Sequence, residues 1–374
     1  MRTLTLPIQA GRLIVTVRRE EWPLERCLAC ATRQNPRRLY LFVSKVLGKH
    51  WPVRPTVMRE IHVLLATKIA DLPGPLLVIG MAETATALGR GVAEEAALQA
   101  GRDDILYLQT TRCRLSRPLA FQFDECHSHA PDHAVYLPER ALQPLFRTAR
   151  TLVLVDDEIS TGRTLMELAR AYVAYNPGVE RIALACITNW LSDARRRELA
   201  ASLERPLRFP ALVEGEFHFE PDSAFPPPAL PQVAVGAARR HDDLAADPAR
   251  VGLVAGRWRS PRWPACPRGR SLTIVGTGEY AYTPFRLALA LEEDGWDVRF
   301  QSTTRSPILV GDAIASRREF PDNYGDGIPN YLYNFDPDRL PVVVYEHPAM
   351  LAAHPLPGLI GGLALTVEEP CRAS

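Results

Sequence analysis

The segment from Leu152 to Thr164 constrains the fold of this chain more than any other part of the sequence. It reads LVLVDDEISTGRT, so a short apolar run leads into two adjacent aspartates and then a loop rich in hydroxyl groups. A continuous apolar run of this length is typical of a strand that is buried on both faces of a parallel sheet. The following GRTLMELARAYVAYN has helical spacing. We therefore expect a strand, a tight loop and a helix.

Other segments repeat this alternation of strand and helix. Strands are expected in PLLVIG, DDILYLQTT and RIALACITNW, and helices in MREIHVLLATKIA and ALGRGVAEEAALQAG. This order predicts an α/β fold, with a parallel sheet covered by helices on both faces. A chain of 374 residues exceeds what one core usually covers. We expect a first domain at 1–220, a Pro/Arg-rich linker at 221–270 and a smaller C-terminal α/β domain at 271–374.

The composition argues against several classes of partner. The formal net charge of +1 gives no field to hold nucleic acid or an anionic membrane. No apolar run approaches the ~20 residues of a membrane span, and no signal-peptide pattern opens the sequence. Seven scattered cysteines suit reduced thiols, so we expect a cytoplasmic protein. The lone CxxC pair, Cys27 and Cys30, leaves a zinc site open as an alternative.

The loop after the 152–155 strand carries groups that suit a sugar phosphate. Ligands of open α/β sheets bind at the carboxyl ends of the strands. Asp156 and Asp157 suit the two vicinal hydroxyls of a ribose, or the water ligands of a hard cation. The next residues offer hydroxyls, close backbone approach and helix N-terminal amides to a phosphate: Ser160, Thr161, Gly162 and Thr164. The alternative is an ordinary capped helix, since Asp, Ser and Thr are common caps.

This segment resembles the motif of type I phosphoribosyltransferases that binds 5-phosphoribosyl-1-pyrophosphate (PRPP). The resemblance implies ribose contacts at Asp156 and Asp157, and Mg²⁺ held there directly or through water. It also implies PRPP contacts along the whole loop, including Glu158 and Arg163. It also implies that a nucleophile displaces pyrophosphate from C1 of PRPP. Purine-specific members usually carry a carboxylate where this chain has Ser160. A hydroxyl there is similar to orotate-type members, so we expect an orotate-like or other non-purine small-molecule acceptor.

The resemblance also predicts a pyrophosphate-binding loop in VIGMAETATALG, at Met81, Ala82, Glu83 and Thr84. Glu83 would repel a pyrophosphate unless Mg²⁺ or an arginine lay between them, and its alternative role is charge at a helix N-terminus. Lys45 and Lys49 are two of only three lysines in the chain. They are candidate phosphate ligands, or they belong to one exposed turn.

Arg112 and three histidines lie where the family carries a mobile catalytic loop. Arg112 suits pyrophosphate because a guanidinium binds phosphate oxygens in a fork. His127, His129 and His133 are candidates for acid–base catalysis, phosphate contact or metal binding, and the alternative is a merely polar loop.

Beyond the motif, the chain resembles the phosphoribosyltransferases of bacterial tellurite-resistance and related stress clusters. LYLFVSKVLGKHWPV and the HSHAPDH loop carry this likeness, and the C-terminal unit resembles their TRSP domain, with Thr304–Pro307 as the eponymous motif. The family is thought to make or modify a nucleoside-like metabolite. The resemblance implies a Mg²⁺-dependent enzyme, and many relatives of this kind form homodimers. The alternatives are a PRPP- or nucleotide-binding regulator without catalysis, and reversal or hydrolysis on a nucleotide.

Finally, the two domains show an internal similarity. LLVIGMAETATALG aligns with LTIVGTGEYAYTPF, YLQTTR with FQSTTR, and TLVLVDDE with LPVVVYEH. We therefore predict that the C-terminal domain is a decayed copy of the first. Its acid pair has become Tyr345 and Glu346 with no STG loop after it, so this copy should not bind PRPP normally. Its 276–279 and 303–306 segments retain the groups for an oxyanion pocket. The alternative is that short β–loop–α units look alike by chance.

Overall fold

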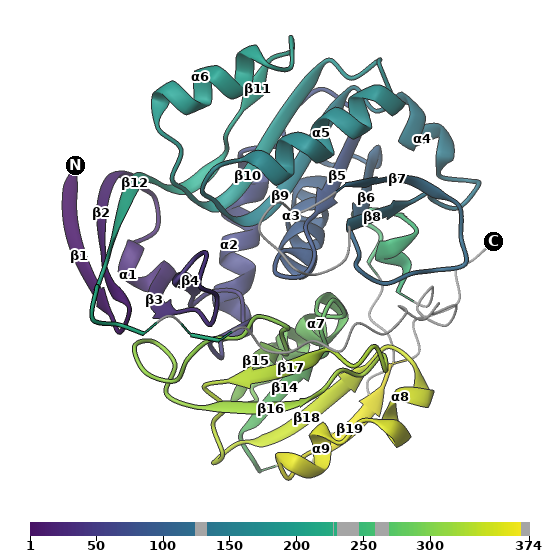
Figure 1. Cartoon of the computed structure of the whole chain (residues 1–374). Helices are drawn as coiled ribbons and strands as arrows, with labels where there is room; N and C mark the ends of the chain where they lie inside the picture. The colour runs from purple at the N-terminus through teal and green to yellow at the C-terminus, as the bar shows by residue number, and fades with distance from the viewer. Residues whose placement is uncertain (124–132, 227, 230–246, 259–268, 368–374) are drawn as a thin grey trace.

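The computed structural model describes the whole chain except residues 124–132, 227, 230–246, 259–268 and 368–374. Two α/β units lie against each other, with the purple-to-teal N-terminal part above the green and yellow C-terminal part (Figure 1). In the described part, no helix is long and apolar enough to cross a membrane.

The first unit is built on one large mixed sheet. Its strands run in the order β1 (Arg2–Ile8), β2 (Gly11–Glu20), β12 (Ala211–Pro221), β10 (Arg181–Asn189), β9 (Thr151–Ile159), β5 (Leu76–Gly80), β6 (Ile105–Gln109) and β13 (Leu253–Val254), with β11 (Leu207–Arg208) beside β10. The pairs between β12 and β6 are parallel, as predicted. The edge strands β1, β2 and β13 are antiparallel, which the sequence analysis did not anticipate.

Helices cover both faces of this sheet. From β5 the chain crosses to β6 on one side, and from β9 it crosses to β10 on the other side. Since such crossovers are right-handed, their helices α3 (Thr86–Ala100) and α5 (Arg163–Tyr175) lie on opposite faces. The remaining elements of this unit are α1 (Leu24–Cys27), α2 (Pro55–Thr67), α4 (Gln143–Thr148), α6 (Asp193–Ala201), the hairpin β3 (Leu28–Thr32) and β4 (Tyr40–Ser44), and the hairpin β7 (Leu119–Phe123) and β8 (His133–Tyr136).

The second unit is a smaller parallel sheet. Its strands run in the order β15 (Val298–Ser302), β14 (Leu272–Gly276), β18 (Leu340–Tyr345) and β19 (Leu363–Thr366). With it come α7 (Tyr282–Glu293), α8 (Pro348–Ala353), α9 (Leu356–Leu359) and the hairpin of β16 (Arg317–Pro321) and β17 (Pro329–Tyr333). The segment that was expected to be a linker contains β13 and the short 3-10 helix η2 (Pro248–Arg250), and β13 extends the first sheet.

The two sheets share one topology, which supports the predicted repeat. The order β6–β5–β9–β10 corresponds to β15–β14–β18–β19. The registers also agree strand by strand. Leu76 pairs with Ile105 and Thr151, and its counterpart Leu272 pairs with Val298 and Leu340. Along the chain, both units also carry an antiparallel hairpin at the equivalent place: β7 and β8 lie between β6 and β9, and β16 and β17 lie between β15 and β18. The shared order and register extend the likeness from the aligned segments to a whole sheet, and the duplication itself stays a prediction.

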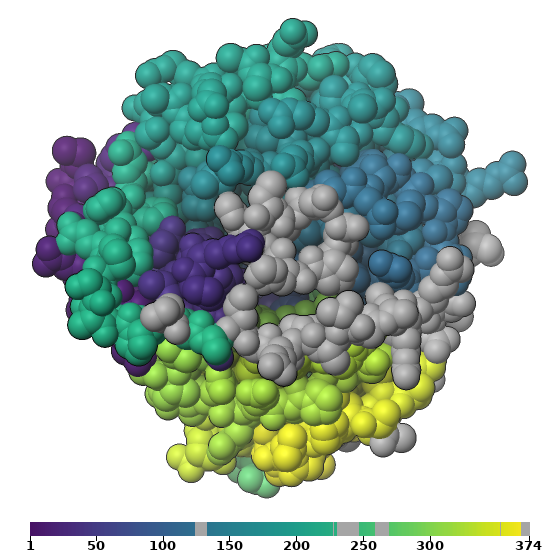
Figure 2. All heavy atoms as spheres, in the orientation of Figure 1, coloured from purple at the N-terminus to yellow at the C-terminus, as the bar shows by residue number. Residues whose placement is uncertain are grey.

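The units pack through an apolar cluster in which helices of the first meet α7 of the second. Met58 of α2 and Ala87 of α3 belong to the same buried cluster as Phe285. The backbones of Val53 and Phe300 also exchange two hydrogen bonds of 3.0 and 2.8 Å. In Figure 2 the light-green C-terminal unit lies directly against the purple part of the first. The two units therefore share a buried apolar interface.

Candidate functional site

The predicted sugar-phosphate loop lies between β9 and α5. Asp156 and Asp157 are half-buried in the last residues of β9, and the Asp157 amide donates to Asp156 Oδ1 at 2.9 Å. Gly162 has a left-handed φ of 71° at the N-cap position, so the chain turns sharply before α5 begins. No described side chain caps this helix beyond a 3.4 Å contact from the Arg163 amide to Thr161 Oγ1. Amides of its first turn therefore face the loop and suit an anion.

The second predicted loop, residues 81–84, follows the neighbouring strand β5. The Met81 amide donates to Val155 O at 2.9 Å, which ties this loop to the strand that carries the aspartates. The Ala82 amide donates to Thr110 Oγ1 at 2.8 Å, and the peptide bond from Ala82 to Glu83 is cis. Both loops thus lie at the carboxyl edge of one parallel sheet, on adjacent strands, where ligands of such folds bind.

Arg112 and His133 meet beside the second loop. The Arg112 Nη2 lies 3.3 Å from His133 Nε2, and His133 Nδ1 lies 3.1 Å from Thr110 Oγ1. Because a guanidinium only donates, Nε2 is the acceptor, and the proton of a neutral ring lies on Nδ1 facing Thr110. The imidazole is buried and stacks on Phe123 at 5.2 Å. His127 and His129 lie outside the described residues.

Glu158 is paired with a residue that the sequence analysis did not single out. Arg38, just before β4, donates to Glu158 Oε1 at 2.7 Å. Burial raises the pKa of Glu158, and Arg38 only partly offsets this effect. Next to this pair, the β3–β4 hairpin and the ends of β9 and β10 enclose a small pocket. Its lining residues are Cys27, Leu28, Phe42, Ser44, Asp157, Glu158, Ile187 and Thr188.

The two candidate lysines have different surroundings. Lys45 Nζ donates to Glu25 O at 3.0 Å and lies over the Trp51 ring. Lys49 is 2% exposed, with its Nζ 2.7 Å from Gly278 O and 3.3 Å from Glu83 Oε1. It thus joins the loop at 81–84 to the C-terminal unit.

Glu83 is surrounded by cations. Arg305 of the C-terminal unit approaches it with its Nε at 3.8 Å and donates from its amide at 3.3 Å. Burial pushes the pKa of Glu83 upward, but Lys49 and Arg305 outweigh burial and hold that pKa below its usual range. Cations of the protein therefore neutralise the charge that was expected to repel a pyrophosphate.

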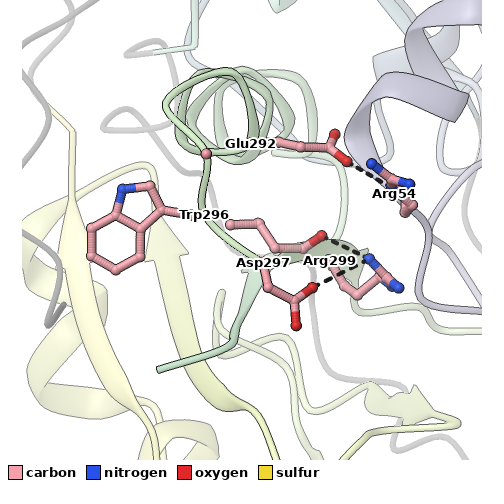
Figure 3. A pocket seen from close by; sticks show the side chains of 7 residues that line it. Arg54, Glu292, Trp296, Asp297 and Arg299 are labelled. Atoms are coloured by element: carbon pink, nitrogen blue, oxygen red, sulfur yellow. Dashed lines mark hydrogen bonds and ion pairs between the residues drawn. The ribbon is translucent and has the colours of Figure 1, made fainter. Parts of the chain in front are cut away.

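A polar surface pocket elsewhere has a different character (Figure 3). It is lined by Arg54, Glu292, Gly295, Trp296, Asp297, Val298 and Arg299. It lies where β15 begins, at the edge opposite to the ligand-binding end of a parallel sheet. Its charges are matched, with Arg54 Nε 2.8 Å from Glu292 and Arg299 3.7 Å from Asp297. We assign no function to it.

The cysteine pair does not gather metal ligands. Cys27 and Cys30 are buried free thiols, and burial raises the pKa of each to about 12. Among the described residues no three His, Cys, Asp or Glu side chains cluster as a metal site would require.

Comparison with known families identifies the chain. Residues 27–216 match the model of a family described as phosphoribosyl transferase. The chain belongs to this phosphoribosyltransferase family. Residues 240–360 match the TRSP domain, which is described as lying C-terminal to that transferase domain. The predicted membership of a phosphoribosyltransferase family and the predicted TRSP domain are thereby confirmed.

Parts of this chain are also similar to several solved phosphoribosyltransferases. An adenine phosphoribosyltransferase of Trypanosoma brucei matches at 15% identity and TM-score 0.31, over 42% of this chain and 65% of its own length. One from Giardia lamblia matches at 16% and 0.30, over 42% and 80%. An orotate phosphoribosyltransferase of Mycobacterium tuberculosis matches at 12% and 0.28, over 46% and 81%. These likenesses do not bear on the acceptor, and no curated protein matches the sequence.

Proposed function

We propose that this phosphoribosyltransferase binds Mg²⁺ and PRPP between the loops 156–164 and 81–84 and transfers the phosphoribosyl group to a non-purine small molecule. The observation that carries the proposal is the meeting of both loops at one edge of the sheet, through the bond from Met81 to Val155. One loop offers two carboxylates and an open helix N-terminus, and the other offers backbone near Arg112. These groups match the ribose, 5-phosphate and pyrophosphate parts of PRPP.

The aspartates also suit a metal. Asp156 and Asp157 are adjacent, half-buried carboxylates, the hard oxygen donors that Mg²⁺ takes directly or through water. When bound there, Mg²⁺ supplies positive charge to the diphosphate. The residues of the chain hold the ribose through its hydroxyls, hold the 5-phosphate at the start of α5, and direct Arg112 toward the leaving group. Positioning and charge stabilisation then favour departure of pyrophosphate from C1 as the acceptor approaches.

We propose that the acceptor approaches the ribose from the side of the β3–β4 hairpin, where a pocket of about 10 Å³ has room for about one water and must widen to admit a ring. The pocket adjoins Asp157, so an acceptor there would lie next to the ribose. Phe42, whose ring stacks on Trp190, lines the pocket, and Ser44 and Thr188 add hydroxyls to its lining. A raised pKa lets Glu158 hold a proton more readily than an ordinary glutamate does, so it suits exchange of a proton with a ring nitrogen.

Calorimetry with PRPP, with and without Mg²⁺, tests the proposal. We expect Mg²⁺-assisted binding by the wild type, and loss of binding by Asp156→Asn/Asp157→Asn because the ribose hydroxyls lose their charged acceptors. Candidate acceptors are then screened by pyrophosphate release.

The outcomes separate the alternatives. Binding that the double variant retains would contradict the assignment of the acids. Binding without release of pyrophosphate from any acceptor would favour a PRPP-binding regulator. Turnover of a mononucleotide would favour the reverse reaction if it required added pyrophosphate, and hydrolysis if it did not.

A further inference from the structure

Each unit holds the arginine loop of the other through one glutamate. Glu279 of the C-terminal unit accepts from the Arg112 amide at 2.8 Å and from Thr111 Oγ1 at 2.6 Å. In the reverse direction, Glu83 accepts from the Arg305 amide at 3.3 Å. Glu83 and Glu279 are both three residues past the end of their strands, β5 and β14, and the two arginines are three past β6 and β15. The contact is therefore reciprocal between equivalent residues.

The loops that carry these residues also have the same internal bonds. The Ala82 amide donates to Thr110 Oγ1 at 2.8 Å, and the equivalent Gly278 amide donates to Thr303 Oγ1 at the same distance. The amides of Thr110 and Thr303 in turn donate to the last residues of β5 and β14, each at 3.0 Å. Reciprocal contacts between two such copies are the geometry of a twofold dimer, here within one chain.

The second copy has a filled site. Arg250 of η2 is fully buried, with its Nε 3.2 Å from Glu279 and its Nη1 2.5 Å from Glu346. Glu346 is the counterpart of Asp157, so Arg250 spans the space that corresponds to the PRPP site of the first unit. Tyr345, in place of Asp156, is bonded to His354 at 2.6 Å. The oxyanion pocket expected in this copy is thus taken by a side chain of the protein.

We propose that the C-terminal domain is a built-in partner subunit, and that its Glu279 is a positioning residue that fixes the Arg112 loop of the active unit. This inference rests on the proposed function. Glu279 accepts two hydrogen bonds from the loop, and Arg250 holds the carboxylate in place. Burial tends to raise the pKa of Glu279, but Arg250 and these hydrogen bonds outweigh burial and lower that pKa. The carboxylate therefore stays ionised and continues to accept hydrogen bonds from the Arg112 loop.

The test compares three variants of the full chain. Glu279→Ala removes both bonds to the loop, while Glu279→Gln retains an oxygen for the Arg112 amide. Glu346→Ala is the matched control, because it takes the other carboxylate from Arg250 without touching the loop. Three quantities are measured: hydrogen exchange at the Arg112 amide without ligand, affinity for inorganic pyrophosphate with Mg²⁺, and melting temperature.

We expect Glu279→Ala to speed exchange at the Arg112 amide and to weaken pyrophosphate binding about tenfold or more, since a lost hydrogen bond to a charged group frees the loop. Glu279→Gln should retain most of the exchange protection at the Arg112 amide and most of the pyrophosphate affinity. Glu346→Ala should lower the melting temperature but leave both readouts within about threefold of wild type. Equal effects of the two alanine variants on exchange and affinity would overturn the positioning role.

Light scattering tests the partner-subunit part. We expect the particle in solution to have the mass of one chain, 41.6 kDa. A stable dimer would contradict the proposal that the C-terminal domain takes the place of a partner subunit. If the wild type fails to bind pyrophosphate, the proposed function fails, whereas exchange at Arg112 still decides whether Glu279 holds the loop.

Discussion

Gly162 offers the sharpest test of the phosphate loop. Its φ of 71° lies in the left-handed region, and a Cβ added there would lie 2.8 Å from Leu199 Cδ1. Gly101, which ends α3, is the matched control, because it has a similar φ of 60° and nothing within 4 Å of an added Cβ. Both substitutions to alanine therefore strain the backbone alike, and only one lies in the proposed site.

The backbone conformation and these contacts set the expected losses of stability and of PRPP affinity. A left-handed alanine costs about 1–2 kcal/mol at either position. Gly162→Ala costs about 1 kcal/mol more, because the Leu199 side chain must move off its preferred rotamer. If the loop relaxes and one amide loses its phosphate, about 1.5–3 kcal/mol of binding free energy disappears, or roughly 10- to 150-fold in the dissociation constant for PRPP.

Urea unfolding and PRPP calorimetry on both variants check these values. Gly101→Ala should lose stability and keep its PRPP affinity, whereas Gly162→Ala should lose both. Wild-type affinity in Gly162→Ala, alongside the expected loss of stability, would refute the placing of the 5-phosphate at this loop. An equal loss of affinity in both variants would refute the local argument, because it would reflect strain alone.

Two further substitutions probe buried charges. Lys49→Met should destabilise the chain by about 3–5 kcal/mol, because it leaves Glu83 buried with one cation fewer. Lys45→Met should cost only about 1 kcal/mol, because Lys45 is half-buried and its Nζ donates to a backbone carbonyl; urea unfolding distinguishes the two variants. Arg38→Ala should raise the already raised pKa of Glu158 further, so its loss of stability should grow as the pH rises from 5 to 8, because the ionised acid then lacks its cation. A loss that does not change with pH would contradict this account.

The parts of the fold that were predictable from sequence are those with a local signature. β5 and the inner parts of β9 (Leu152–Val155) and β10 (Ile182–Ile187) are apolar because both faces of the sheet are covered there, and continuous runs of this kind stand out in the sequence. The repeat could also be predicted, because the aligned segments are the strands and loops of equivalent sheets. In the first two strands, β2 alternates between buried and half-buried positions and β1 between exposed and half-buried ones, and that weaker pattern was missed.

The site was predictable only where one loop carries its chemistry. The run from Asp156 to Thr164 is contiguous, so its pattern is visible in the sequence. Arg38 and Glu158 are 120 residues apart, and only the folded sheet brings them together. Arg250 lies in a segment that looks like linker, and nothing around it indicates that it is the largest fully buried side chain of the described residues. Long-range charge pairs of this kind leave no local signal.

Fusion of the two copies has a thermodynamic consequence for the filled site. A linked copy associates within the chain, so it avoids the loss of translational freedom that two separate subunits incur. Its interface therefore needs no bound ligand to hold it together. The second site can lose its acids and its phosphate loop, provided that the space and charge are replaced, and Arg250 supplies both between Glu279 and Glu346. We therefore expect each chain to bind one PRPP, and a calorimetric stoichiometry of two would contradict a filled second site.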